Sequence, residues 1–143
     1  MTRQTISSPL PSDKAVLESV FAIDQIASRG DLGRQSELRT ALREGRLRVA
    51  WRDSTPVGYY VLAPWWFGAS FLQLLYVDAR HRRSGIGHEL IDDARRRVSG
   101  RLFTSTNQSN APMQALLESV GWLSCGRLEG LDEDDPELFY RTG

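Results

Sequence analysis

The chain has 143 residues, of which 41% are hydrophobic and 25% are charged, and these values fit one globular domain over residues 1–143. Eighteen basic and 18 acidic side chains give a formal net charge of zero, which argues against a broad nucleic-acid-binding surface. The single cysteine cannot form an internal disulfide and no apolar leader opens the sequence, so we expect a cytoplasmic protein. The most apolar stretch, residues 59–77, is interrupted by Pro64 and Gly68, which favours two buried strands over a membrane span.

The pattern of apolar residues predicts a short strand and two helices at the start of the chain. Residues 4–7 form the strand, and Ser12 caps a helix that ends at Gly30. Four apolar residues share one face of this helix: Val16, Val20, Ile23 and Ala27. A second helix is expected over residues 36–44, with Gly45 as its stop.

Three strands follow in the sequence. Residues 46–52 alternate between polar and apolar side chains, and the turn at residues 53–56 joins them to residues 57–62 in a hairpin. The third strand covers residues 71–77 and leads into a glycine-rich turn.

The second half of the chain predicts two more helices and three more strands. A helix over residues 86–98 ends near Gly100, a short strand covers residues 101–104, and Asn110 caps a helix that ends at Gly121. The last two strands are expected at residues 122–128 and 137–141. The predicted order is β-α-α-β-β-β-α-β-α-β-β, in which the unit over residues 71–104 requires a parallel pair of strands.

The turn after the third strand has the sequence Arg82-Arg83-Ser84-Gly85-Ile86-Gly87. Glycines allow close approach of the main chain, and the first N–H groups of a helix have no partner within the helix. The helix dipole adds partial positive charge at the same point. This turn therefore predicts a binding site for a pyrophosphate.

The spacing of this turn excludes two common phosphate-binding motifs. A dinucleotide-binding fingerprint would need a third glycine where Leu90 stands, and an acidic residue within 101–110, where there is none. A P-loop needs a lysine after its last glycine, but Lys14 is the only lysine in the chain. The pattern Arg/Gln-x-x-Gly-x-Gly/Ala after a strand does fit, and it resembles the acyl-CoA-binding motif of the GNAT acetyltransferase superfamily.

A second segment carries the same resemblance. Residues 110–122, from Asn110 to Trp122, are similar to the family pattern N-x-x-A-x-x-L-Y-x-x-x-G-F. The resemblance covers nearly the whole chain and implies an α/β (α+β) fold. The expected architecture is a mixed central β-sheet of six to seven strands, flanked by about four helices.

The resemblance also implies where acetyl-CoA binds. Main-chain groups of Leu75, Tyr76 and Val77 are expected to pair with the pantetheine arm like an added strand, and one N–H group there polarises the thioester carbonyl. Arg82 and the N–H groups from Arg83 to Gly87 are expected to hold the pyrophosphate, with Asn110 near the pantetheine. No spacing of His, Cys, Asp or Glu indicates a metal site.

The chain departs from the family at the two positions that handle protons. Acyl transfer needs a group that accepts the proton of the amine, and many relatives place a glutamate on the strand before the motif, where this chain offers Gln73. Relatives often use a tyrosine as general acid at the position of Leu117. Tyr140 and Tyr60 are the nearest phenols that could replace it, and the alternative for each is a place in the core or in a pocket wall.

Three features bear on the acceptor and on partners. The acidic segment 131–137 could attract a cationic amine, or it could be a solvated loop. Trp65-Trp66-Phe67 could wall an acceptor pocket or form a homodimer contact. Cys125 could accept an acyl group, although a small buried strand residue is the plainer interpretation.

These observations predict an acetyl-CoA-dependent N-acetyltransferase acting on a primary amine of a small molecule, peptide or protein. Gln73 and Leu117 keep open a non-catalytic acyl-CoA-binding or regulatory domain of the same fold. A nucleic-acid-associated protein, based on the arginine clusters, is disfavoured by the zero net charge.

Overall fold

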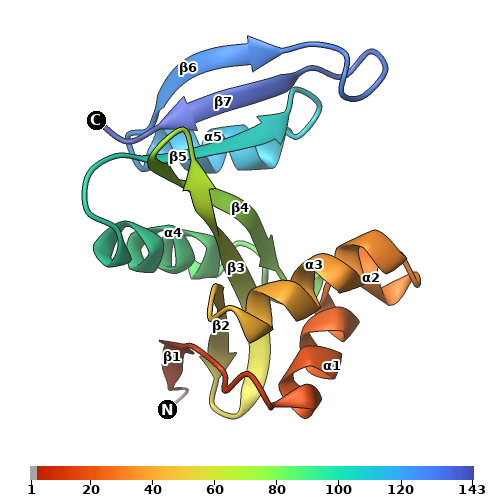
Figure 1. Ribbon diagram of the computed structural model, residues 1–143. Helices are drawn as coiled ribbons and strands as arrows, with labels where there is room; N and C mark the ends of the chain where they lie inside the picture. Colours follow the sequence, from red (N-terminus) through yellow and green to blue (C-terminus); the bar gives the residue numbers. More distant parts are fainter. Residues whose placement is uncertain (1–2) are drawn as a thin grey trace.

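The computed structural model describes residues 3–143, apart from the side chains of Pro64 and Trp65. Seven strands form one mixed sheet in the order β1-β2-β3-β4-β5-β7-β6 (Figure 1). Within residues 3–143 only the β4–β5 pair is parallel, and the other neighbours are antiparallel. The strands are β1 (Gln4–Ser7), β2 (Leu47–Arg52), β3 (Thr55–Trp66), β4 (Ala69–Val77), β5 (Leu102–Asn107), β6 (Leu123–Leu128) and β7 (Glu137–Arg141). The predicted mixed α/β sheet is confirmed.

Helices cover both faces of this sheet, and each face has its own apolar cluster. One cluster joins the first three helices to β2 and β3, and the other joins the last two helices to β3, β4, β5 and β7. A short 3-10 turn, Ala79–His81, follows β4. The helices are α1 (Lys14–Ile23), α2 (Gln25–Ser28), α3 (Leu32–Arg43), α4 (Ile86–Arg97) and α5 (Ala111–Ser119).

The single helix predicted over residues 12–30 is wrong, because Asp24 divides it. Asp24 has an extended backbone that ends α1, and its carboxylate then caps α2 by accepting hydrogen bonds from the N–H groups of Ile26 and Ala27. The cap of α1 is Asp13 rather than Ser12, since the carboxylate of Asp13 accepts from the N–H of Val16. The described residues therefore contain five helices instead of four.

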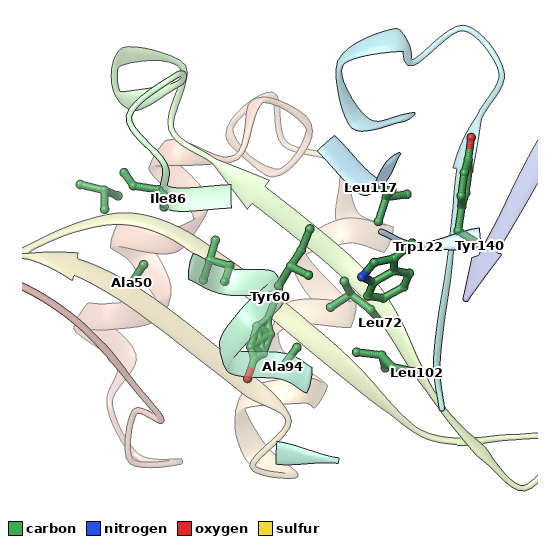
Figure 2. Close-up of a cluster of buried hydrophobic side chains, with 12 residues drawn as sticks. Ala50, Tyr60, Leu72, Ile86, Ala94, Leu102, Leu117, Trp122 and Tyr140 are labelled. Atoms are coloured by element: carbon green, nitrogen blue, oxygen red, sulfur yellow. The ribbon is translucent and has the colours of Figure 1, made fainter. Parts of the chain in front are cut away.

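The core beneath α4 and α5 includes residues of β4, β5 and β7, together with Trp122, which precedes β6. Figure 2 shows Leu117 and Trp122 packed beside Tyr140 of β7, with Leu72 of β4 and Leu102 of β5 close by. All five side chains are at least 95% buried. This packing fixes α5 against the sheet next to the point where β4 and β5 meet.

Candidate active site

The strands β4 and β5 pair briefly and then diverge. Their ladder ends at Leu72 and Thr104, and the hydroxyl of Thr104 closes it by donating to the carbonyl of Leu72 at 2.8 Å. Beyond this point β4 stays paired with β3 through Val77, while β5 pairs with β7 on its far side (Figure 1). Within residues 3–143 no strand pairs with the β5-facing edge of Leu75, Tyr76 and Val77. That edge has no strand partner and is open to an extended ligand, although the carbonyl of Val77 accepts a hydrogen bond from Arg82.

A β-bulge marks the start of the fork. Leu72 pairs with Leu62 and Leu74 pairs with Val61, so Gln73 is an extra residue in β4. A bulge turns peptide groups out of the regular ladder. The amide of Gln73 donates to the carboxylate of Glu37 on α3 at 3.2 Å, and its oxygen accepts from Arg46 at 3.4 Å. Many relatives have a glutamate on the strand at the position of Gln73, and in this chain Glu37 of α3 places a carboxylate beside that position. The spacing of residues in the sequence does not reveal this contact.

The glycine-rich turn forms an open helix N-terminus. Gly85 is the N-cap of α4 with φ 85°, and no side chain caps the helix there. Arg83 also has a positive φ of 64°, in the left-handed region of backbone conformation. The side chain of Ile86 is buried in the core beneath the turn (Figure 2). The hydroxyl of Ser84 donates to the carbonyl of His81 and holds the turn closed.

Gly87 serves helix packing in this turn. A Cβ atom at Gly87 would lie 2.9 Å from Cδ2 of Leu116, closer than side chains normally approach. The missing side chain therefore allows α4 to approach α5. This contact brings Asn110, the N-cap of α5, to the same side of the sheet, where its carboxamide oxygen accepts from the N–H of Met113 at 3.2 Å.

Arg82 connects the turn to the fork. Its Nε atom donates to the carbonyl of Val77 at 3.3 Å, and its guanidinium lies 5.7 Å from the ring centroid of Tyr76. The hydroxyl of Tyr76 accepts from the N–H of Gln25 at 3.0 Å, at the start of α2. Contacts through Arg82, Tyr76 and Gln25 thus connect the predicted phosphate-binding turn to α2 on the opposite face of the sheet.

The two candidate phenols lie in different places. Tyr60 is wholly buried, and its hydroxyl donates to Asp93 of α4 at 2.5 Å, so its proton is engaged by a carboxylate of the core. Burial is the largest cause that raises the pKa of Tyr60, and the hydrogen bond to Asp93 adds to it. Tyr140 packs in the same cluster as Leu117, the family's tyrosine position. Burial raises the pKa of Tyr140, and Glu118 raises it further, so its hydroxyl keeps its proton.

The acidic segment 131–137 is partly structural. Asp132 accepts a hydrogen bond from the side chain of Asn107 at 2.8 Å, and Asp135 accepts from the N–H and the hydroxyl of Ser109 at 2.9 and 2.6 Å. These contacts hold the β6–β7 loop against the end of β5. Cys125 is exposed on β6, so the expectation that it is buried is wrong.

β3 extends through Trp66, beyond the predicted strand at residues 57–62, so Trp65 and Trp66 belong to its end. The side chain of Trp65 lies outside the described residues. Trp66 contacts the rings of Phe71 and Phe103. Within the described residues no group of three or more His, Cys, Asp or Glu could hold a metal ion, and no helix is long and apolar enough to cross a membrane.

Comparison with known families identifies the family of this chain. Residues 17–122 match the Acetyltransferase (GNAT) family. The chain belongs to that family. No curated protein sequence matches it closely.

Solved structures of GNAT acetyltransferases share the fold over the full chain. A GNAT-family acetyltransferase from Bacillus cereus is 28% identical, with 98% of this chain and 96% of that chain covered and a TM-score of 0.87. A ribosomal-protein-alanine N-acetyltransferase from Brucella melitensis is also 28% identical, with 96% and 98% covered and a TM-score of 0.71. An aminoglycoside 6′-N-acetyltransferase solved with coenzyme A is 14% identical, with 96% of each chain covered and a TM-score of 0.80.

The GNAT co-substrate is acetyl-CoA, and the residues present in this chain fit it. The uncapped N-terminus of α4 at Gly85 suits a pyrophosphate, because its first N–H groups have no side-chain partner. The unpaired edge of β4 from Leu75 to Val77 suits the amides of a pantetheine arm.

Proposed function

We propose that residues 1–143 form one acetyltransferase domain that moves an acetyl group from acetyl-CoA directly to a primary amine of a small molecule, peptide or protein. The fork between β4 and β5, which begins immediately beyond Leu72 and Thr104, is the observation that carries this proposal. Acetyl-CoA supplies the activated acetyl group. The protein supplies the binding edge, the hydrogen-bond donors and the groups that handle protons.

The main chain performs most of the binding. Peptide groups of Leu75, Tyr76 and Val77 hold the pantetheine, and an N–H group next to the bulge at Gln73 faces the thioester oxygen. N–H groups from Arg83 to Gly87 hold the pyrophosphate. Asn110, whose side chain caps α5, lies near the same arm in this proposal.

Two side chains on opposite faces of the sheet handle the protons in this proposal. Glu37 accepts the proton of the amine, because Gln73 holds its carboxylate beside the fork on the α3 side. Tyr140 donates a proton to the departing sulfur on the α5 side, where its ring packs in the cluster that contains Leu117. The amine therefore loses its proton on one face of the sheet, and the departing thiolate gains a proton on the other. Tyr60 has no part in this scheme, since its hydroxyl is buried against Asp93.

A binding domain without turnover is the second candidate. It is favoured by the same two positions, Gln73 and Leu117, at which the chain lacks the side chains that many relatives use. Release of free CoA with a broad panel of amines separates the two candidates. Turnover with any amine excludes the second candidate, and binding of acetyl-CoA without turnover excludes the first.

The cofactor site is tested by melting temperature with and without acetyl-CoA. A ligand at 100 times its Kd stabilises a protein by about 2.7 kcal/mol, which raises the melting temperature by several degrees. Gly85→Glu places a carboxylate where the pyrophosphate is expected. Gly100→Glu is the matched control, because Gly100 has nearly the same φ, 81° against 85°, at the far end of α4. We expect the shift in the wild type and in Gly100→Glu, and its loss in Gly85→Glu alone.

Two other melting-temperature results would contradict these expectations. A folded wild type with no shift at saturating acetyl-CoA would exclude the proposed function. Equal melting-temperature shifts in both variants would show that the pyrophosphate does not bind at the N-terminus of α4.

A further inference from the structure

Four aromatic rings gather on one face of the sheet beside the fork. The ring centroid of Trp66 lies 4.8 Å from that of Phe71, 5.1 Å from that of Phe103 and 6.0 Å from that of Phe139. All four side chains are only half-buried. Side chains alternate between the two faces along β5 and β7, so these rings lie on the face opposite α5. On this face α1, α2 and α3 cover only the neighbouring strands (Figure 1). This aromatic floor has no covering helix among residues 3–143.

A shallow hollow of ≈ 520 Å³ lies over this floor and extends across β5, β7 and β6. Three arginines, Arg101, Arg127 and Arg141, line it, and no carboxylate of the described residues does. Arg101 makes no side-chain hydrogen bond or ion pair within residues 3–143. Arg141 donates to the carbonyl of Thr142, and Arg127 pairs with the exposed Glu129. The hollow thus combines an apolar floor with two arginines, Arg101 and Arg141, that form no ion pair with a described carboxylate.

The hollow adjoins the proposed acetyl-transfer site. Phe103 pairs with Phe71 one step before the last pair of the β4–β5 ladder, Leu72 with Thr104. The hollow also lies on the sheet face that carries α3 and Glu37. A molecule seated on the floor could therefore extend an amine to the fork from the side on which we place the proton acceptor.

We propose that this hollow binds the acceptor, and that the acceptor is a primary amine carrying an aromatic or bulky apolar group together with a carboxylate, as in an apolar α-amino acid. This inference rests on the proposed acetyltransferase function. The apolar group packs on Trp66, Phe103 and Phe139, where burial of apolar surface and ring stacking stabilise it. The carboxylate pairs with the arginines, with Arg101 the least engaged of the three. Repulsion from the same arginines disfavours a polycationic amine.

Binding can be tested without any chemistry, using N-acetyl-L-phenylalanine as the reaction product and N-acetyl-L-phenylalaninamide as its neutral analogue. Titration calorimetry on the full chain should show about tenfold tighter binding of the carboxylate form, the scale of one favourable charged contact. Arg101→Gln should remove most of this difference. Arg95→Gln is the matched control, because Arg95 is an exposed arginine of α4 on the opposite face of the sheet, and it should keep the difference.

Turnover gives the second measurement. Free CoA release should be faster with L-phenylalanine than with L-phenylalaninamide, and Arg101→Gln should reduce this preference without changing the melting-temperature shift caused by acetyl-CoA. Turnover of other amines without binding of N-acetyl-L-phenylalanine would overturn the inference and leave the proposed function standing. Carboxylate-selective binding that Arg101→Gln abolishes, with no response to acetyl-CoA, would place a ligand in the hollow, but it would reject the proposed function and with it the role of the hollow as an acceptor site.

A second copy of the chain is the competing occupant. Light scattering measures the mass in solution for the wild type and for Arg101→Gln combined with Phe139→Ser. A wild-type dimer that the double variant dissociates, together with no binding of either ligand, would overturn the inference. A monomer that binds the carboxylate ligand supports it.

Discussion

Tyr59 and Tyr60 are neighbours in β3 and extend to opposite faces of the sheet, where each hydroxyl donates a hydrogen bond to a buried aspartate. Tyr59 donates to Asp24, the residue that separates α1 from α2. Tyr60 donates to Asp93 of α4 at 2.5 Å. This pair of tyrosines therefore connects the sheet to α2 on one face and to α4, which begins after the glycine-rich turn, on the other.

An arginine completes each of these contacts. Arg34 of α3 pairs with Asp24 at 2.7 Å, and Arg48 of β2 pairs with Asp93 at 2.8 Å. Neither aspartate is an unpaired buried charge, because each carboxylate is satisfied from two sides.

The first prediction concerns the two phenols considered for catalysis. Tyr60→Phe should lower the free energy of unfolding by about 1–3 kcal/mol, since it removes a donor from a buried carboxylate, and should leave kcat of the folded enzyme unchanged. Tyr140→Phe should instead lower kcat by at least about tenfold and change the free energy of unfolding little. Urea unfolding and CoA release measure both. A large loss of kcat in Tyr60→Phe at unchanged stability would contradict its structural role.

The second prediction concerns pH and stability. Burial raises the pKa of Asp24, but hydrogen bonds from Tyr59, Ala27 and Arg34 outweigh it and hold the pKa below its ordinary value. The pKa of Asp93 is also below its ordinary value, because hydrogen bonds from Arg48 and Tyr60 outweigh the effect of burial. A carboxyl group with a lower pKa in the folded state contributes stability that is complete above its unfolded pKa of about 3.9, and loses it as the pH falls through the folded pKa. The free energy of unfolding should therefore change little between pH 7 and about pH 5, and fall below about pH 4.

Substitution of Asp24 isolates this effect. Asp24→Asn should be less stable than the wild type at pH 7, and the difference should shrink as the pH falls, because protonation of the wild-type carboxyl removes the same charge. Asp134→Asn is the control, since Asp134 is exposed in the β6–β7 loop. Urea unfolding at a series of pH values measures the difference. A constant gap between wild type and Asp24→Asn at every pH would contradict the assignment.

Local signals were sufficient to predict most elements, including the helix that begins after the glycine-rich turn. The glycine-rich sequence, its position after a strand and the cap at Asn110 are short-range features, and the structure contains the helices that they predicted. The helix break at Asp24 was missed because Val20, Ile23 and Ala27 continue a helical spacing across it. Tertiary contacts from Tyr59 and Arg34 hold Asp24 extended, and a single sequence contains no record of them.

The sequence could not predict the position of Glu37, our proposed proton acceptor, or the hollow, for a similar reason. A one-residue bulge at Gln73 changes which face its side chain occupies, and alternation cannot reveal the extra residue. The contact between Gln73 and Glu37 joins residues 36 positions apart. The hollow assembles side chains from β3, β5, β6 and β7, so only the strand order brings its arginines together.

The third prediction concerns close approach around α4. A Cβ atom at Gly58 of β3 would lie 2.9 Å from the carbonyl oxygen of Tyr76, and also against Leu90 and Ile86. Gly58→Ala should lower the free energy of unfolding by about 1–3 kcal/mol, because a backbone atom cannot move aside cheaply. Gly87→Ala should cost less, since its neighbour is the end of a leucine side chain. Urea unfolding ranks the two, and an equal or larger loss in Gly87→Ala would show that α4 cannot shift relative to α5.

The fourth prediction tests Glu37 as the proton acceptor. Glu37→Gln should lower kcat/KM for the amine by about a hundredfold near neutral pH, a loss typical of removing a general base, and should leave the acetyl-CoA melting shift intact. Raising the pH should partly restore the rate, because a larger fraction of the amine is then already neutral. Glu18→Gln is the control, an exposed glutamate of α1 that should behave like the wild type. An unchanged kcat/KM and pH profile in Glu37→Gln would assign proton acceptance to water, with Gln73 and Glu37 left as a link between β4 and α3.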